Sequence, residues 1–325
     1  MVSGPLLVLD TNVFRGTSTR ELASLRSRGF VIRVSDLALY EAWARSVRDY
    51  GEGRASRPQA RGILFARARA VAPYLDASAP LASSGGALAR KVIANVDGGL
   101  PKPDDDKYFQ HLVDLWRRVI GIGLTDEEWI EAGNDAQEHL ADLDKQLCGL
   151  ARRDVELRQN AVPDDVDPAD LPRQQQLWDS LSDDQRFEAV RGYLKSTWTM
   201  SEAVAERFDA HIAVTAHRLR SAASGARMPK KNDGADAALT MHIAEGCILV
   251  TGETQLIKLV DGSKTYQAPW VRRIDDLDDL PRGRETRPMS SRGRAPESLC
   301  EALRGGAADR VGLAAGRGVL WMRST

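Results

Sequence analysis

A short apolar run near the N-terminus constrains the fold of this chain more than any other feature. Residues 5–10 read PLLVLD, a continuous apolar stretch that ends in a carboxylate. Continuous apolar runs are typical of strands covered by helices on both faces, as in parallel sheets. A similar run occupies residues 30–35, and helical patterns follow the two runs at residues 17–28 and 36–50. This alternation predicts an α/β fold with a parallel sheet.

The same elements return near the other end of the chain. Residues 232–246 have a helical pattern, and residues 247–250, CILV, repeat the composition of the first strand. The pattern then predicts a short helix at residues 253–260 and a last strand at residues 268–274. Because open α/β sheets bind ligands outside the carboxyl ends of their strands, we expect a site where the two ends of the chain meet.

The remaining segments differ in pattern from these two ends. Residues 51–222 hold one helical pattern after another, broken by clusters of proline, glycine and aspartate. Residues 281–325 are rich in Arg, Gly and Ser without periodicity, which predicts a disordered tail. We therefore expect a discontinuous α/β/α domain of residues 1–50 and 223–280, interrupted by a large all-helical insertion at residues 51–222.

Composition excludes several classes of protein. The net charge of the 325 residues is −1, so only local charge can indicate nucleic-acid binding. The three cysteines, Cys148, Cys247 and Cys300, are far apart, which excludes a disulfide framework and a C-x-x-C zinc pair. Residues 5–9 are too short for a signal-peptide core, and no apolar run approaches the ~20 residues that cross a bilayer. We expect a cytoplasmic protein that does not associate with membranes.

Carboxylates recur where the predicted strands end or the predicted helices begin. Asp10 ends the first strand, and Glu253 stands two residues after Thr251, just past the strand CILV. Glu41 lies at the edge of an apolar stripe of its helix, and Asp236 begins another such stripe. A parallel sheet would bring these acids to one rim.

Carboxylates crowded at one rim repel one another unless a cation lies between them. Mg²⁺ and Mn²⁺ prefer oxygen ligands, keep several waters, and lower the pKa of a water so that it can attack a phosphodiester. The four acids therefore predict metal-dependent hydrolysis.

The segments that carry these acids resemble a known family, the PIN-domain nucleases. The resemblance lies in LLVLDTNVF, SDLALYE, NDGADAALTMHIAEG and CILVTGE, in this order along residues 4–48 and 225–260, roughly a quarter of the chain. It implies a PIN-like α/β/α domain. By the same resemblance, the catalytic metal ligands are the acids of the four segments: Asp10, Glu41, Asp236 and Glu253. Supporting roles fall to Asn12 and Thr251, which would orient ligands or water, and to Asp233.

The resemblance also implies an activity, an endoribonuclease that hydrolyses RNA with a water activated by one or two Mg²⁺ or Mn²⁺ ions. A toxin paired with an antitoxin, or a defence effector, would fit this class. Two departures keep alternatives open. Glu253 stands where the family has aspartate, and the helical insertion is far longer than in the small toxins of the family. The chain could instead cut DNA or branched structures, or be a catalytically silent scaffold that binds RNA or protein.

Each acid also has a purely structural interpretation. Asp10 could close an Asx-turn after its strand, and Glu41 could pair with Arg45 four residues later. Asp233 and Asp236 could form the N-cap and N3 position of a capping box. Glu253, similarly, could sit in the first turn of the helix that follows it.

Positive charge gathers close to the second acid. Residues 42–73 contain seven arginines and two acids. Such charge could hold a phosphate backbone, although a solvated helix face is the alternative. The candidates for nucleic-acid binding are the basic residues near the acidic segments: Arg45, Arg48, Lys230, Lys231 and Lys258.

Overall fold

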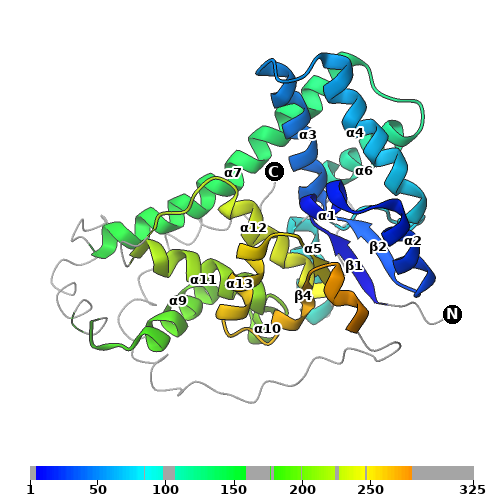
Figure 1. The fold of residues 1–325 in the computed structure, drawn as a ribbon. Helices are drawn as coiled ribbons and strands as arrows, with labels where there is room; N and C mark the ends of the chain where they lie inside the picture. The colour runs from blue at the N-terminus through cyan, green and yellow to red at the C-terminus, as the bar shows by residue number, and fades with distance from the viewer. Residues whose placement is uncertain are drawn as a thin grey trace.

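The computed structural model shows a small sheet surrounded by helices (Figure 1). It describes residues 5–83, 85–97, 107–158, 176, 179–198, 200–223, 227–245 and 247–279. The predicted tail at residues 281–325 lies outside the described residues. No described helix combines the length and the apolar character needed to cross a membrane.

The four expected strands form one parallel sheet. Its strands are β1 (Leu6–Leu9), β2 (Val31–Val34), β3 (Ile248–Val250) and β4 (Val271–Arg272), in the order β2-β1-β3-β4. In the register, Leu7 of β1 lies between Ile32 of β2 and Ile248 of β3. The predicted α/β class and parallel sheet are confirmed, and the two ends of the chain meet at the β1–β3 pair.

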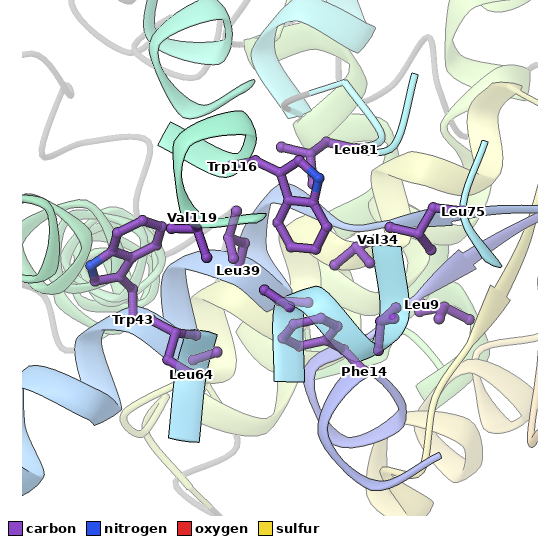
Figure 2. Packing of buried hydrophobic residues seen from close by; sticks show 14 of the residues in the cluster. Leu9, Phe14, Val34, Leu39, Trp43, Leu64, Leu75, Leu81, Trp116 and Val119 are labelled. Carbon is purple, nitrogen blue, oxygen red and sulfur yellow. The ribbon is translucent and has the colours of Figure 1, made fainter. Parts of the chain in front are cut away.

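The continuous apolar run of β1 is explained by burial on both faces of the sheet. Leu7 and Leu9 pack in the largest core cluster, with Phe14 and Trp116 (Figure 2). Val8 faces the opposite side, and all three strand residues are at most 1% exposed. Since neither face meets water, an alternating polar pattern would leave polar groups without hydrogen bonds.

The helix predicted at residues 17–28 is present as α2 (Thr19–Ser27), and a short helix that the sequence pattern does not predict, α1 (Thr11–Gly16), precedes it. Asp10 caps α1 by accepting a hydrogen bond from the Thr11 amide, and Ser18 forms a capping box with Glu21 at the start of α2. The third helix, α3 (Asp36–Gly51), follows β2 as expected.

Helices make up the regular structure described between residues 51 and 222, apart from a single bridge between Leu81 and Val34 beside β2. The helices are α4 (Arg57–Val71), η1 (Ala72–Tyr74), α5 (Gly85–Asp97), α6 (Lys107–Ile120), α7 (Asp126–Arg158), α9 (Asp183–Thr197), α10 (Glu202–Arg207) and α11 (Asp209–Ala223). Trp116 and Trp129 from this segment lie in the same core cluster as β1. The division into domains stays a prediction.

The C-terminal elements follow the expected order with shorter regular segments. They are α12 (Asp233–Leu239), η3 (Thr240–Glu245), α13 (Thr254–Gly262), η4 (Ala268–Trp270) and η5 (Asp275–Asp279). The strand expected at residues 268–274 is reduced to two residues. Pro269 stands in η4 and lacks the amide proton that a strand would need there.

The long helix α7 crosses α3, the helix that carries Glu41 (Figure 1). The Trp43 indole N–H donates to the Trp129 carbonyl at 3.0 Å. A Cβ placed on Gly133 of α7 would lie 2.2 Å from a Val47 methyl group, closer than real atoms approach. Glycine at this position therefore allows the two helices to pack closely.

We expect Gly133→Ala to lower the free energy of unfolding by about 1–3 kcal/mol, because the added methyl group must displace a stiff β-branched side chain. Gly149 lies on the same helix, and a Cβ placed on it would meet no atom within 4 Å. Gly149→Ala is therefore the matched control and should be neutral or stabilising by up to about 1 kcal/mol. Urea unfolding measures both, and equal effects of the two substitutions would contradict the close packing.

Candidate functional site

Asp10 lies at the carboxyl end of β1 and is 3% exposed. Its carboxylate accepts hydrogen bonds from the Thr11 amide and from the Thr251 hydroxyl, the latter at 2.6 Å. Burial raises the pKa of Asp10 above its ordinary value, these hydrogen bonds lower it, and the charge of Glu253 raises it. Asp10 is thus both a helix cap and a neighbour of the fourth predicted acid.

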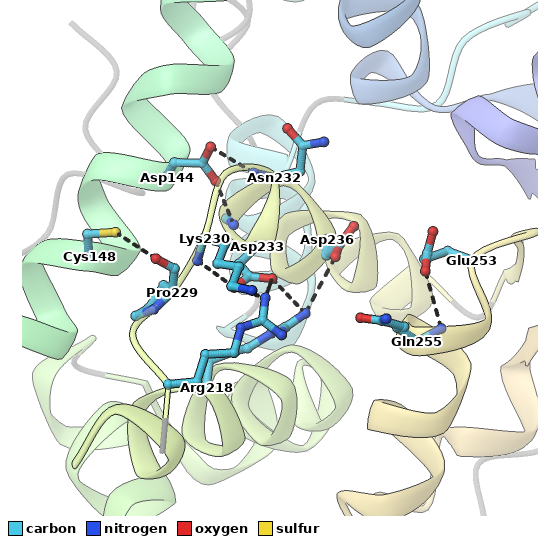
Figure 3. A network of polar contacts seen from close by, with 12 residues as sticks. Asp144, Cys148, Arg218, Pro229, Lys230, Asn232, Asp233, Asp236, Glu253 and Gln255 are labelled. Carbon is cyan, nitrogen blue, oxygen red and sulfur yellow. Dashed lines mark hydrogen bonds and ion pairs between the residues drawn. The ribbon is translucent and has the colours of Figure 1, made fainter. Parts of the chain in front are cut away.

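The turn after β3 joins the fourth acid to the first. Thr251 is fully buried, and its hydroxyl also accepts a hydrogen bond from the Glu253 amide at 3.0 Å. Glu253 caps α13 by accepting from the Gln255 amide at 3.3 Å (Figure 3). Its position at the start of this helix agrees with the structural interpretation, and its charge still acts on Asp10.

Glu41 is half-buried on α3. Burial raises its pKa, the charges of Asp10 and Asp144 raise it further, and the charge of Arg15 lowers it. The expected alternative partner, Arg45, instead lies 3.6 Å from Asp49. Glu41 therefore faces the acids at the sheet edge, with Arg15 as a cation that moderates its charge.

Asp236 is also strongly perturbed by its surroundings. Burial raises its pKa to about 7, the Arg218 guanidinium lowers it, and the charges of Asp10, Glu41 and Asp233 raise it. The Arg218 Nη2 atom lies 3.5 Å from the Asp236 carboxylate. The raised pKa shows that the arginine does not fully compensate the burial of Asp236 and the repulsion from its neighbours.

Asp233 is bound by cations of the protein itself. Its carboxylate lies 3.0 Å from Arg218 and 3.0 Å from Arg227, and it accepts from the Lys230 amide at 2.7 Å (Figure 3). The helix cap is Asn232, with a left-handed φ of 75°. The capping box considered for Asp233 and Asp236 is therefore not formed, and Asp233 anchors the start of α12.

Two residues of the central helices complete this region, and the sequence pattern indicates neither. Asp144 on α7 accepts from the amides of Asn232 and Gly234 at 2.8 and 2.9 Å, which fixes the N-terminus of α12. Arg218 on α11 bridges Asp233 and Asp236 (Figure 3). No local motif marks either residue, because their roles depend on which helices pack against α12.

Four acids are thus brought into one electrostatic group: Asp10, Glu41, Asp236 and Glu253. Their carboxylate oxygens are donors of the kind that Mg²⁺ and Mn²⁺ prefer, and the raised pKa values of the first three reflect burial and unbalanced negative charge. In the described part of the chain, no three His, Cys, Asp or Glu side chains form a group that could hold a metal ion. The carboxylate oxygens are suitable ligands for a divalent cation, but the described side chains are not arranged as a complete set of metal ligands.

The remaining predicted site residues lie around this group. Asn12 is exposed, and its Cβ would be 3.3 Å from a Cβ on Gly252, beside the turn after β3. The exposed lysines of the set are Lys230, Lys231 and Lys258. Arg45 is exposed and Arg48 is half-buried.

The arginine-rich stretch largely serves the fold. Arg57 and Arg61 both pair with Asp126, at 3.2 and 2.6 Å. Arg67 and Arg69 donate to main-chain carbonyls of other segments. These contacts favour the structural alternative for most of the stretch.

We expect Asp236→Asn to raise the melting temperature at pH 8 in EDTA by several degrees and to change it little at pH 4. The folded pKa of about 7 exceeds the ordinary 3.8, so the stability present at low pH is lost as pH rises through 7. The neutral side-chain amide in Asp236→Asn does not ionise, so the variant avoids this loss of stability. The control is Asp209→Asn, whose carboxylate pairs with Arg191 and should therefore lower the melting temperature at pH 8. Equal destabilisation by both would contradict the crowding of Asp236.

Comparison with models of known families, with curated proteins and with solved structures finds no match to this chain. The interpretation of the acidic group therefore depends on its own geometry and chemistry. At one edge of a parallel sheet, the charge of Asp10 acts on Glu41 and Asp236, the charge of Glu253 acts on Asp10, and Arg218 contacts Asp236.

Proposed function

We propose that this protein is a divalent-metal-dependent nuclease of the PIN type that cleaves RNA internally. The observation that supports this most directly is the electrostatic coupling of four carboxylates at the carboxyl edge of the sheet. Buried acids that repel one another are costly unless a cation compensates them. Groups of uncompensated buried acids are typical of functional sites, because they lower the stability of the fold.

In the proposed mechanism the four acids hold one or two Mg²⁺ or Mn²⁺ ions: Asp10, Glu41, Asp236 and Glu253. Such an ion lowers the pKa of a water and stabilises charge that develops on a phosphodiester. Thr251 keeps one Asp10 oxygen fixed through its 2.6 Å hydrogen bond, which orients the carboxylate. Arg218 balances part of the charge of Asp236 and lies where it could contact a substrate phosphate.

The substitution Asp10→Asn tests the activity with little risk to the fold, because asparagine is also a good helix cap. We expect the wild type to cut labelled single-stranded RNA with Mn²⁺ or Mg²⁺ and not with EDTA. The variant should cut RNA at least about a hundredfold more slowly, because removing one catalytic group that stabilises charge typically has an effect of this size. The readout is the pattern of fragments, since internal cutting gives products of intermediate length.

The matched control is Asp36→Asn. Asp36 is also buried, at the start of α3, but it lies 3.4 Å from His242 and is absent from the causes that perturb the acidic group. The Asp36→Asn variant should cut RNA like the wild type. A DNA strand of the same sequence tests the rival substrate. If neither strand is cut with metal, or if Asp10→Asn cuts as fast as Asp36→Asn, the proposed activity is wrong.

Metal binding can be measured without turnover. We expect millimolar Mn²⁺ to raise the melting temperature of the wild type, because a ligand at 100 times its Kd stabilises the folded state by about 2.7 kcal/mol. Asp10→Asn should lose most of this increase and Asp36→Asn should keep it. A rise in wild type without cleavage would support a scaffold that binds metal, and no rise at any Mn²⁺ concentration would remove the basis for a metal site.

A further inference from the structure

A cavity of about 320 Å³ lies between α11, the start of α12 and α13. Its wall includes Arg218, Arg227 and Lys258, against a single carboxylate, Asp233. Lys258 is one of the nucleic-acid contacts predicted from the sequence, whereas no sequence motif marks Arg218 or Arg227. The cavity is therefore a positively charged hollow that only the packing of these helices creates.

The cations of the cavity are not fully used by the fold. Both arginines contact Asp233 through their Nη2 atoms, and Arg218 contacts Asp236 through the same atom. Within the described residues, the Nε atoms of both arginines have no hydrogen-bond partner, but both atoms are buried and are not donors for a ligand. Lys258 is exposed and takes no part in the ion pairs that hold Asp233. The cavity thus keeps positive charge, and the exposed Lys258 ammonium as a donor, for an anionic ligand.

The cavity also has an apolar side. Met228 is 41% exposed there, and Leu259 is half-buried beside it. A hollow of about this volume is at the small end of typical ligand sites. Charged donors on one side and apolar groups on the other suit a ligand that has a phosphate and a flat organic ring.

Two contacts connect the cavity to the acidic group. Arg218 lines the cavity and reaches Asp236 at 3.5 Å. Gln255 also lines it, and its amide donates to Glu253 at 3.3 Å (Figure 3). Neither acid lines the cavity, so a ligand there would be separated from Asp236 by Arg218 and from Glu253 by Gln255.

We propose that this cavity binds one nucleotide of a single-stranded nucleic acid next to the bond that the acidic group cuts. Its phosphate contacts Arg218, Arg227 and Lys258, and its base packs against Met228 and Leu259. The role of the cavity as a substrate subsite rests on the proposed nuclease function, but the binding itself does not require cleavage.

The test measures binding of a fluorescein-labelled 12-nucleotide RNA by anisotropy in EDTA, where no metal-dependent cleavage occurs. We expect Lys258→Gln to weaken binding about three- to tenfold near 0.1 M salt and to reduce the slope of log K against log salt by about 1. The matched control is Lys264→Gln. Lys264 follows α13, pairs with Asp184 at 2.8 Å and does not line the cavity. Unchanged melting temperatures would exclude unfolding as the cause.

Competition identifies the ligand. Adenosine monophosphate should displace the labelled RNA at lower concentration than inorganic phosphate does, because only the nucleotide has a base, and Lys258→Gln should weaken binding of both competitors, because both carry a phosphate. Equal competition by the two anions would overturn the nucleotide assignment, and binding by Lys258→Gln that equals the wild type, or falls no further than Lys264→Gln, would overturn the site. Cleavage is scored separately: loss of cutting in Asp10→Asn with normal RNA binding supports the nuclease alone, whereas Lys258-dependent binding without any cutting supports the cavity alone.

Discussion

The parallel pairing of β1 with β3 is the contact on which the rest of the structure depends. It joins segments about 240 residues apart, and the Thr251 hydroxyl bonds the Asp10 carboxylate across the end of the pair. Because all four strands run in the same direction, their carboxyl ends share one edge. Any acid that follows a strand is therefore carried to that edge, and α3 and α12 begin close enough to add Glu41 and Asp236.

The acids near this edge differ in how far protein contacts compensate their charge. Asp144 fixes the N-terminus of α12 through two main-chain amides, and Asp233 is bound between two arginines. Asp10, Glu41 and Asp236 are left with raised pKa values because burial and mutual repulsion outweigh their partners. Repulsion of this kind is relieved by a bound cation, so the proposed metal binding would raise the stability of the fold.

The helices between the two ends of the chain are part of the same structure. Trp116 and Trp129 complete the core over the sheet, while α7 and α11 supply Asp144 and Arg218 to the acidic edge. The same α11 forms one wall of the cationic cavity. These helices therefore contribute to both the acidic group and the cationic cavity.

The sequence by itself determined the four strands, the parallel α/β class and the acids at the strand ends, because a doubly covered strand requires a continuous apolar run and an abrupt polar end. It also predicted a site made of Asp10, Glu41, Asp236 and Glu253, which stays a prediction; in the folded chain Asp10 acts electrostatically on Glu41 and Asp236, and Glu253 acts on Asp10. Only the tertiary structure decided the rest. The arginine pair around Asp233, the role of Asp144 and the internal contacts of the arginine-rich stretch depend on packing between distant segments, which local spacing does not encode.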